Sequence, residues 1–253
     1  MFNVASDIHF FSKQGMRNRL RGNARFKDLH RNERCFILGT GPSLNGLGRR
    51  YIAALENETI FGVNSLYKST IVQNVVPKYY VLMDNNYWTE STDTFLEVRR
   101  NYYDNPPVFI TDIRASNFIP VEAEPILLYA KNYPLSRTRY DLTKSISIAM
   151  NVVGFSIITA MYMGFKDIYL LGCDYNSFCS PTGSHCYVDS EEYKQLKKNN
   201  LSFYLKYYHI TTECHYSISK TAKQDKINII NLTEGSLLDA YPKQRISDIF
   251  KID

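Results

Sequence analysis

Several classes of protein are excluded by what this 253-residue sequence has little of. Glycine (12) and proline (9) are scarce and apolar residues make up 44% of the chain, so collagen-like and disordered classes do not fit. The five cysteines are odd in number and include no Cys-x-x-Cys pair, which argues against a disulfide framework and a structural zinc site. We therefore expect reduced thiols, with Cys35 and Cys173 on buried strands.

The sequence also shows no pattern typical of secretion or membrane insertion. Residues 1–11 lack a basic region followed by an apolar run and a small-residue cleavage site. The longest nearly uncharged stretch, 145–165, contains Ser, Thr and Asn side chains in a helical pattern, so we interpret it as a buried helix. We expect a cytoplasmic protein, and the basic segment described next leaves peripheral attachment to the inner face of the cytoplasmic membrane open.

Positive charge is concentrated near the N-terminus. The formal net charge is +5, and residues 13–34 hold eight Lys and Arg against one Asp and one Glu. We predict a basic N-terminal arm, 1–34, followed by one domain, 35–253. The arm fits an anionic bilayer surface, a lipid-linked acceptor or nucleic acid, and a solvated helix is the simple alternative. Nucleic acid is not the expected partner, because the 20 tyrosines are spread through apolar segments rather than through the arm.

Apolar runs without alternation are followed by helical segments along most of the chain. Such runs are typical of parallel strands that are covered on both faces. The expected strands span 35–38, 59–63, 79–83, 108–111, 126–129, 167–171 and 227–231. The expected helices span 47–55, 90–103, 151–164 and 191–224, with a polar loop at 176–184. This pattern predicts an α/β fold, a single doubly wound domain with a mostly parallel sheet and helices on both faces, whose ligands bind beyond the carboxyl ends of the strands.

A glycine-containing loop follows the first expected strand. In Gly39-Thr40-Gly41-Pro42-Ser43, backbone N–H groups at a strand-to-helix turn can hold a phosphate, and the glycines remove side chains that would block its approach. No Gly-Lys-Ser/Thr follows, so the loop is not a Walker A motif, and its glycine spacing does not fit a dinucleotide-binding motif. A tight turn that uses Gly and Pro for geometry alone is the alternative.

Short polar side chains follow the next two strands and precede the helix at 151–164. Asn64, Asp84 and Asn85 come at strand ends, where they can bind ribose hydroxyls, a base or a sugar. Asn151 precedes a helix whose positive N-terminal end can face a phosphate or carboxylate. Turn closure and helix capping are the alternatives for each of them. Asp84 has no second carboxylate in its cluster, so a metal site is not expected.

A carboxylate also follows the strand at 167–171. Gly172, Asp174 and Tyr175 lie at its end, where Asp174 can accept a hydrogen bond from a ribose. The alternative is an Asp that starts a turn and orders the next loop.

Histidines that suit general-base chemistry follow this strand. His185 lies in the next loop at the same sheet edge, and an imidazole can accept a proton near neutral pH. Tyr187 would shape the same wall or donate to a leaving phosphate. His209 and His215, in the following helical region, are rival bases, and a structural imidazole is the alternative for all three histidines.

The order and spacing of these motifs resemble a known family. The segments that carry the resemblance lie between residues 33 and 250 and are 39–44, 62–64, 151–174, 185–187 and 235–238. They are similar to the bacterial sialyltransferase-like glycosyltransferases. That family includes the Campylobacter lipooligosaccharide sialyltransferases, the motility-associated flagellin glycosyltransferases, and capsule and O-antigen enzymes.

The resemblance implies a modified Rossmann-like domain, a GT-A variant, that binds a nucleotide-activated sugar without a metal or other cofactor. It implies inverting transfer of a sugar, often from a CMP-linked nonulosonic acid, to a glycan or lipid-linked acceptor in polysaccharide, lipopolysaccharide or capsule biosynthesis. The residues that the resemblance assigns to the donor site are Thr40, Gly41, Ser43, Asn64, Asn151, Gly172, Asp174, Tyr175 and Ser236.

Three alternatives stay open. His185-Cys186-Tyr187 matches a His-Phe-Tyr pattern of some members, whereas the Campylobacter enzymes use a His much later in the chain, so the later histidines stay candidates for the base. The same superfamily includes archaeal enzymes resembling hydroxymethylpterin pyrophosphokinases, so a pyrophosphokinase is the alternative enzyme. A basic nucleic-acid-binding module is the non-catalytic alternative. The sequence predicts no oligomeric state.

Overall fold

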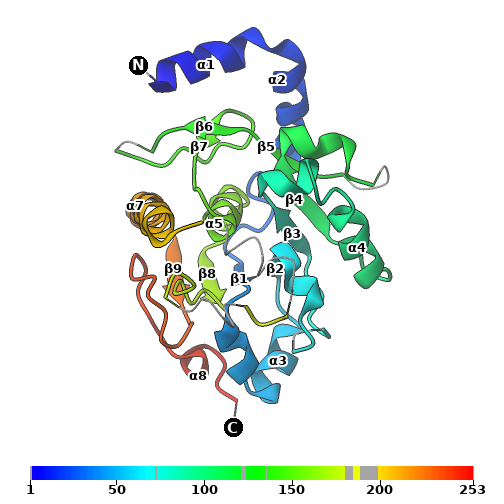
Figure 1. Ribbon diagram of the computed structural model, residues 1–253, viewed down its shortest axis with the longest axis vertical. Coiled ribbons are helices and arrows are strands. Elements are labelled where there is room, and N and C mark those ends of the chain that lie inside the picture. Colours follow the sequence, from blue (N-terminus) through cyan, green and yellow to red (C-terminus); the bar gives the residue numbers. More distant parts are fainter. Residues whose placement is uncertain are drawn as a thin grey trace.

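Seven parallel strands form one sheet at the centre of the structure (Figure 1). The computed structural model describes residues 2–71, 73–120, 124–134, 136–179, 185–188 and 199–252. The strands are β1 (Arg34–Leu38), β2 (Ile60–Val63), β3 (Tyr79–Leu82), β4 (Val108–Asp112), β5 (Ile126–Leu128), β8 (Asp167–Leu171) and β9 (Asn228–Asn231). Their order is β5-β4-β3-β2-β1-β8-β9, and every neighbouring pair is parallel. The predicted α/β fold with a parallel sheet is confirmed.

Alternate residues of each strand contribute to two apolar cores, one on each face of the sheet. Cys35 and Ile37 of β1 face the first core, whereas Phe36 and Leu38 face the second. The helices that cover the first face are α5 (Val152–Tyr162) and α7 (Leu201–Gln224). Those that cover the second are α3 (Arg49–Leu55), α4 (Thr94–Asn101) and α8 (Ile246–Ile249). Because both faces are buried, the strands read in the sequence as unbroken apolar runs.

The segment 145–165 is only partly the buried helix that its composition predicts. Its first residues form β7 (Ile146–Ser147), which pairs with β6 (Ala130–Asn132) in a separate parallel sheet. Met150 has a φ of +59°, and this left-handed residue prevents the helix from beginning earlier. Asn151 then caps α5 by accepting a hydrogen bond from the Gly154 N–H at 2.8 Å. Among the described residues, no helix combines the length and the apolar character needed to cross a bilayer.

The long helical region expected at 191–224 is described from residue 199 onward. Helix α7 begins after Asn200, whose side chain accepts a hydrogen bond from the Phe203 N–H at 2.9 Å. Residues 191–198 of the expected helix and 180–184 of the expected polar loop lie outside the described residues.

The basic N-terminal segment packs on the sheet. It forms α1 (Phe2–Ser12), α2 (Gln14–Arg21) and the short 3₁₀ helix η1 (Gly22–Phe26), and Leu20 is fully buried. The buried Asn23 side chain donates to the carbonyls of Leu127 (2.7 Å) and Leu142 (2.8 Å) and accepts from the Leu127 N–H (3.3 Å). The segment 1–34 is therefore attached to the body of the protein by apolar and polar contacts, while most of its charged side chains are exposed.

We expect the attachment through Asn23 to contribute measurably to stability. Asn23→Ala removes three hydrogen bonds and leaves buried backbone groups of Leu127 and Leu142 without partners, which should lower the free energy of unfolding by about 3 kcal/mol. Urea denaturation measures the change. Asn18→Ala, at an exposed position of α2, is the control and should change stability by less than about 0.5 kcal/mol. Equal stability of the two variants would contradict this assignment.

Candidate functional site

The strand order reverses between β1 and β8. The chain leaves β1 toward β2 on one side of the sheet and leaves β8 toward β9 on the other. In open α/β sheets, ligands bind beyond the carboxyl ends of the strands at such a topological switch point. The loops that follow β1 and β8 are 39–43 and 172–175, the two loops that the sequence analysis selects. Because β1 and β8 are adjacent parallel strands, these two loops lie next to each other at the switch point.

The two loops are hydrogen-bonded to each other. The Gly41 N–H donates to the Gly172 carbonyl at 2.8 Å. Ser43 donates to the Asp174 carboxylate twice, through its N–H (3.1 Å) and its hydroxyl (2.7 Å). A Cβ on Gly39 would lie 2.3 Å from the Gly172 oxygen, and one on Gly41 would lie 1.8 Å from Asp174 Oδ2. The glycines of the β1 loop are thus explained by contact with the β8 loop.

This arrangement changes how the β1 loop would meet a phosphate. The N–H groups of Gly39, Gly41 and Ser43 already donate to protein oxygens, and Pro42 has none. The Asp174 carboxylate also places negative charge beside Ser43, where a further anion would be repelled. Phosphate binding by Gly41 and Ser43 stays a prediction, and the contacts seen here give these residues a structural role.

His185 lies directly against the β1 loop. Its Nδ1 is 3.1 Å from Thr40 Oγ1, and the N–H of the next residue, Cys186, donates to the Thr40 carbonyl at 2.8 Å. The rings of His185 and Tyr187 stack with their centroids 5.2 Å apart and nearly parallel, at an angle of 3°. The structure therefore brings the predicted base, the predicted wall residue and the β1 loop together at the switch point.

Asn64 directly follows β2 and has a backbone conformation that is unusual for a residue other than glycine. Its φ is +46°, and its carbonyl accepts a hydrogen bond from the Tyr80 hydroxyl at 2.9 Å, which fixes the turn. Its side-chain oxygen is buried and has no hydrogen-bond partner among the described residues. A buried acceptor without a partner is costly and needs an explanation, and a bound ligand would supply one.

Asp84 and Asn85 follow β3 and are exposed. The Asp84 carboxylate accepts from the Asn86 N–H at 2.9 Å and so caps a short 3₁₀ helix, in line with the capping alternative. Burial raises the pKa of Tyr207 on α7, and the Tyr175 hydroxyl and the Asp84 carboxylate raise it further. Within the described residues, no three His, Cys, Asp or Glu side chains are grouped closely enough to hold a metal ion.

Asn151 and the rival base His215 belong to one buried hydrogen-bond chain. The Asn151 amide nitrogen donates to His215 Nε2 at 3.0 Å, so Nδ1 carries the proton and donates to the Tyr241 hydroxyl at 2.8 Å. Burial lowers the pKa of His215 to about 3, so this imidazole is neutral near pH 7. Both ring nitrogens are engaged, which gives His215 a structural role. The other rival, His209, is exposed on the same helix.

Tyrosines of α7 cover this edge of the sheet, and the sequence analysis did not select them. The Tyr207 hydroxyl donates to the Met150 carbonyl at 2.7 Å. The Tyr175 hydroxyl is hydrogen-bonded to Thr211, and its ring packs edge-on against Tyr208 with the centroids 4.9 Å apart. The signal for these contacts is the i, i+3 and i+4 spacing of aromatic and small residues after Tyr204, which marks one face of the helix.

Ser236 lies beside the β8 loop but is fully bonded within the protein. Its hydroxyl donates to the Cys173 carbonyl at 2.6 Å and accepts from the Asn231 amide (3.0 Å) and the Leu238 N–H (3.1 Å). These bonds join the loop after β9 to the loop after β8. Contact of Ser236 with a nucleotide stays a prediction.

Comparisons with known proteins support this fold. A family model described as 6-hydroxymethylpterin diphosphokinase MptE-like matches residues 14–177. The solved sialyltransferase CstII from Campylobacter jejuni, in complex with the substrate analogue cytidine-5′-monophosphate, is 14% identical, with a TM-score of 0.51 over 84% of this chain and 85% of that one. The MAf glycosyltransferase from Magnetospirillum magneticum AMB-1 is 13% identical, with a TM-score of 0.57 over 94% of this chain and 39% of that one. This chain therefore spans well under half the length of the MAf enzyme.

No curated protein matches the chain in sequence. The two solved structures are too distant in sequence to carry more than the fold. At that level, the predicted similarity to sialyltransferase-like and motility-associated glycosyltransferases is confirmed.

The buried state of His215 predicts a pH dependence of stability. The unfolded histidine binds a proton below about pH 6.5, whereas the folded one does so only below about pH 3. The stabilisation is therefore complete above pH 6.5 and is lost as the pH falls, by about 1.4 kcal/mol per pH unit. Urea denaturation between neutral and mildly acid pH should show a shallower slope for His215→Gln than for the wild type. His209→Gln is the control and should keep the wild-type slope; equal slopes for all three proteins would contradict the assignment.

Proposed function

The chain belongs to the family of 6-hydroxymethylpterin diphosphokinase MptE-like proteins, and from this premise we propose that it is an enzyme acting on a nucleotide donor at the carboxyl edge of its sheet. The reaction we propose is glycosyl transfer, from a nucleotide sugar to a glycan or lipid-linked acceptor. The observation that carries the proposal is the contact of His185 with Thr40 at the switch point. It supplies a candidate base at the place where this fold class binds its ligands.

The donor that we propose is CMP-linked, with a nonulosonic or related acid as the sugar. The support is the likeness in fold to CstII, whose structure contains cytidine-5′-monophosphate and is matched along most of both chains. In our proposal the buried Asn64 side-chain oxygen accepts a hydrogen bond from the nucleotide or sugar, and Thr40 lies against the donor. Asp84 and Asn85, exposed at the end of the next strand, would contact its outer part.

The chemistry of transfer follows from the contact between His185 and Thr40. When Nδ1–H donates to Thr40 Oγ1, the lone pair of the imidazole is on Nε2. Nε2 then takes the proton of the acceptor hydroxyl as that oxygen attacks the anomeric carbon, and the bond from this carbon to the CMP phosphate oxygen breaks. Attack from the side opposite the leaving phosphate inverts the anomeric centre. Tyr187, stacked on His185, would border the leaving group.

We propose that this transfer needs no metal ion. The leaving group of a CMP-linked sugar is CMP, which carries one phosphate. The charge of this phosphate can be met by hydroxyl groups and by the positive N-terminal end of α5. Assays with and without EDTA test this point.

Family membership itself favours a second candidate, a diphosphokinase that uses ATP and a hydroxymethylpterin. That reaction moves a diphosphate group from ATP to a hydroxyl, and the same histidine could remove the hydroxyl proton. The two candidates differ in the nucleotide that binds. A thermal-shift panel of CMP, UDP, GDP and ATP separates them, because a ligand at 100 times its dissociation constant adds about 2.7 kcal/mol of stability. Stabilisation by ATP and not by CMP would overturn the glycosyltransferase proposal.

A substitution at Asn64, whose buried side-chain oxygen has no hydrogen-bond partner among the described residues, tests the proposed contact with the donor. Asn64→Gly keeps the left-handed backbone conformation at no steric cost and removes the side chain. We expect calorimetry to show a loss of CMP affinity of about tenfold, with the stability of the unliganded protein unchanged or raised.

Asn32→Gly is the matched control, since Asn32 also has a positive φ (+66°). It lies just before β1, at the amino end of that strand and so away from the candidate site. It should keep the CMP affinity of the wild type. The same CMP affinity for both variants would remove Asn64 from the site.

Replacing the proposed base tests the chemical step. A positioned base contributes about 10²-fold or more to the rate, so His185→Gln should lower kcat by that factor while the dissociation constant for CMP changes by less than about threefold. The fall in kcat/KM at low pH, which protonation of the base causes, should disappear in this variant. His209→Gln is the control and should keep the wild-type rate and pH profile. Normal turnover of His185→Gln would reject His185 as the base.

A further inference from the structure

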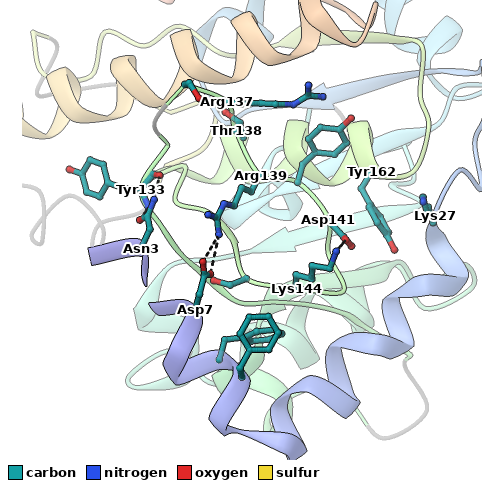
Figure 2. A pocket seen from close by; sticks show the side chains of 15 residues that line it. Asn3, Asp7, Lys27, Tyr133, Arg137, Thr138, Arg139, Asp141, Lys144 and Tyr162 are labelled. Atoms are coloured by element: carbon teal, nitrogen blue, oxygen red, sulfur yellow. Dashed lines mark hydrogen bonds and ion pairs between the residues drawn. The ribbon is translucent and has the colours of Figure 1, made fainter. Parts of the chain in front are cut away.

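A second candidate surface is the cavity drawn in Figure 2. This cavity of about 740 Å³ lies between α1 and residues of the segments 133–134 and 136–145. Its wall includes Tyr162, the last residue of α5, and the chain continues from there to the beginning of β8. The wall also includes Arg137, which pairs with Asp225 between the end of α7 and the beginning of β9. Both contacts place the cavity near the amino ends of the strands. It is therefore separate from the candidate donor site.

One side of α1 is attached to the protein around this cavity. Asp7 forms an ion pair with Arg139 at 2.9 Å, and the Asn3 side chain donates to the Tyr133 carbonyl at 3.0 Å, both drawn in Figure 2. Phe10 is buried and stacks on Tyr129. These contacts hold the helix in a fixed rotation about its axis.

The other side of α1 exposes apolar side chains. Val4, Ile8 and Phe11 are 61%, 65% and 62% exposed. Their spacing of four and then three residues puts them on one face of the helix. Phe11 also lines the cavity, so the apolar face continues to the cavity rim.

Cations exceed carboxylates in α1 and in the segment that follows it. Residues 2–27 contain one carboxylate, Asp7, which is paired with Arg139. The Lys and Arg side chains in the same range are Lys13, Arg17, Arg19, Arg21, Arg25 and Lys27. Among the described residues, Lys13, Arg19, Arg21 and Lys27 have no ion-pair partner. Lys27 also lines the cavity, as does Lys144, which is paired there with Asp141 at 2.9 Å.

We propose that α1 and the cationic rim of the cavity bind the surface of an anionic phospholipid bilayer. An apolar helix face bordered by Lys and Arg is the arrangement that binds at the interface between lipid headgroups and acyl chains. Val4, Ile8 and Phe11 enter this interface, and the unpaired cations contact lipid phosphates. Each such cation strengthens binding by about fivefold. This inference does not rest on the proposed function, since it concerns the edge of the sheet away from His185 and Thr40.

Co-sedimentation with vesicles tests the proposal. Vesicles of phosphatidylcholine with about 30% phosphatidylglycerol provide the anionic surface, and pure phosphatidylcholine is the neutral comparison. We expect the wild type to bind the anionic vesicles at about 0.1 M salt and to be released by about 0.5 M salt, which screens the attraction. Ile8→Asp should weaken binding at least tenfold, and the double variant Arg19→Gln, Arg21→Gln should weaken it about 25-fold.

Leu96→Asp is the matched control, because Leu96, like Ile8, is an exposed aliphatic residue of a surface helix and is 42% exposed on α4. It should bind vesicles like the wild type, and circular dichroism should show that all variants are folded. Absence of wild-type binding, or equal binding by Ile8→Asp, would overturn the proposal. So would a wild-type dimer in gel filtration that Ile8→Asp dissociates, because a second copy of the chain would then cover the apolar face.

Discussion

The close approach of the loops after β1 and β8 positions the rest of the candidate site. Any side chain at Gly39 or Gly41 would collide with Gly172 or Asp174, so the approach depends on the absence of a Cβ at these two positions. Asp174 then accepts two hydrogen bonds from the β1 loop and fixes its path. Thr40 is held between them, and its hydroxyl and carbonyl oxygens meet the histidine segment. A packing constraint at the switch point thus determines where the proposed base lies.

Three of the six described non-glycine residues with a left-handed backbone lie at the same edge of the sheet. Positive φ values occur at Asn64, which follows β2, at Met150, which precedes α5, and at Tyr175, which follows β8. Such conformations are costly for residues other than glycine and persist where surrounding contacts hold them. The Tyr80 hydroxyl bonds the Asn64 carbonyl, and the Tyr207 hydroxyl bonds the Met150 carbonyl, so tyrosines supply those contacts. The high tyrosine content of the chain therefore has a structural use at this edge.

The sequence predicts the sheet better than it predicts the site. Strands buried on both faces appear as apolar runs, whatever their neighbours, so β1 and β8 are recognisable in isolation. The pairing of β6 with β7 is not, because a strand of two residues such as Ile146–Ser147 has no periodicity to detect. The role of Gly41 also depends on Asp174, which is distant in sequence and reaches it only in the folded chain. Sequence reasoning can therefore find the loops at the strand ends but not the contacts between them.

For the proposed function, the choice between the two candidate nucleotides depends on charge. The family name describes the transfer of a diphosphate group. The CstII structure, which is matched over 85% of its length, contains cytidine-5′-monophosphate, a nucleotide with one phosphate. At the β1 loop the Asp174 carboxylate is already present, and the N–H groups of Gly41 and Ser43 are already used. Adding three phosphates beside a carboxylate costs more electrostatic free energy than adding one, unless a bound cation compensates. Under the proposed function, the Asp174 carboxylate is therefore an argument for a donor with a single phosphate, and we expect binding of ATP here to require either a metal ion or displacement of Asp174 from Ser43.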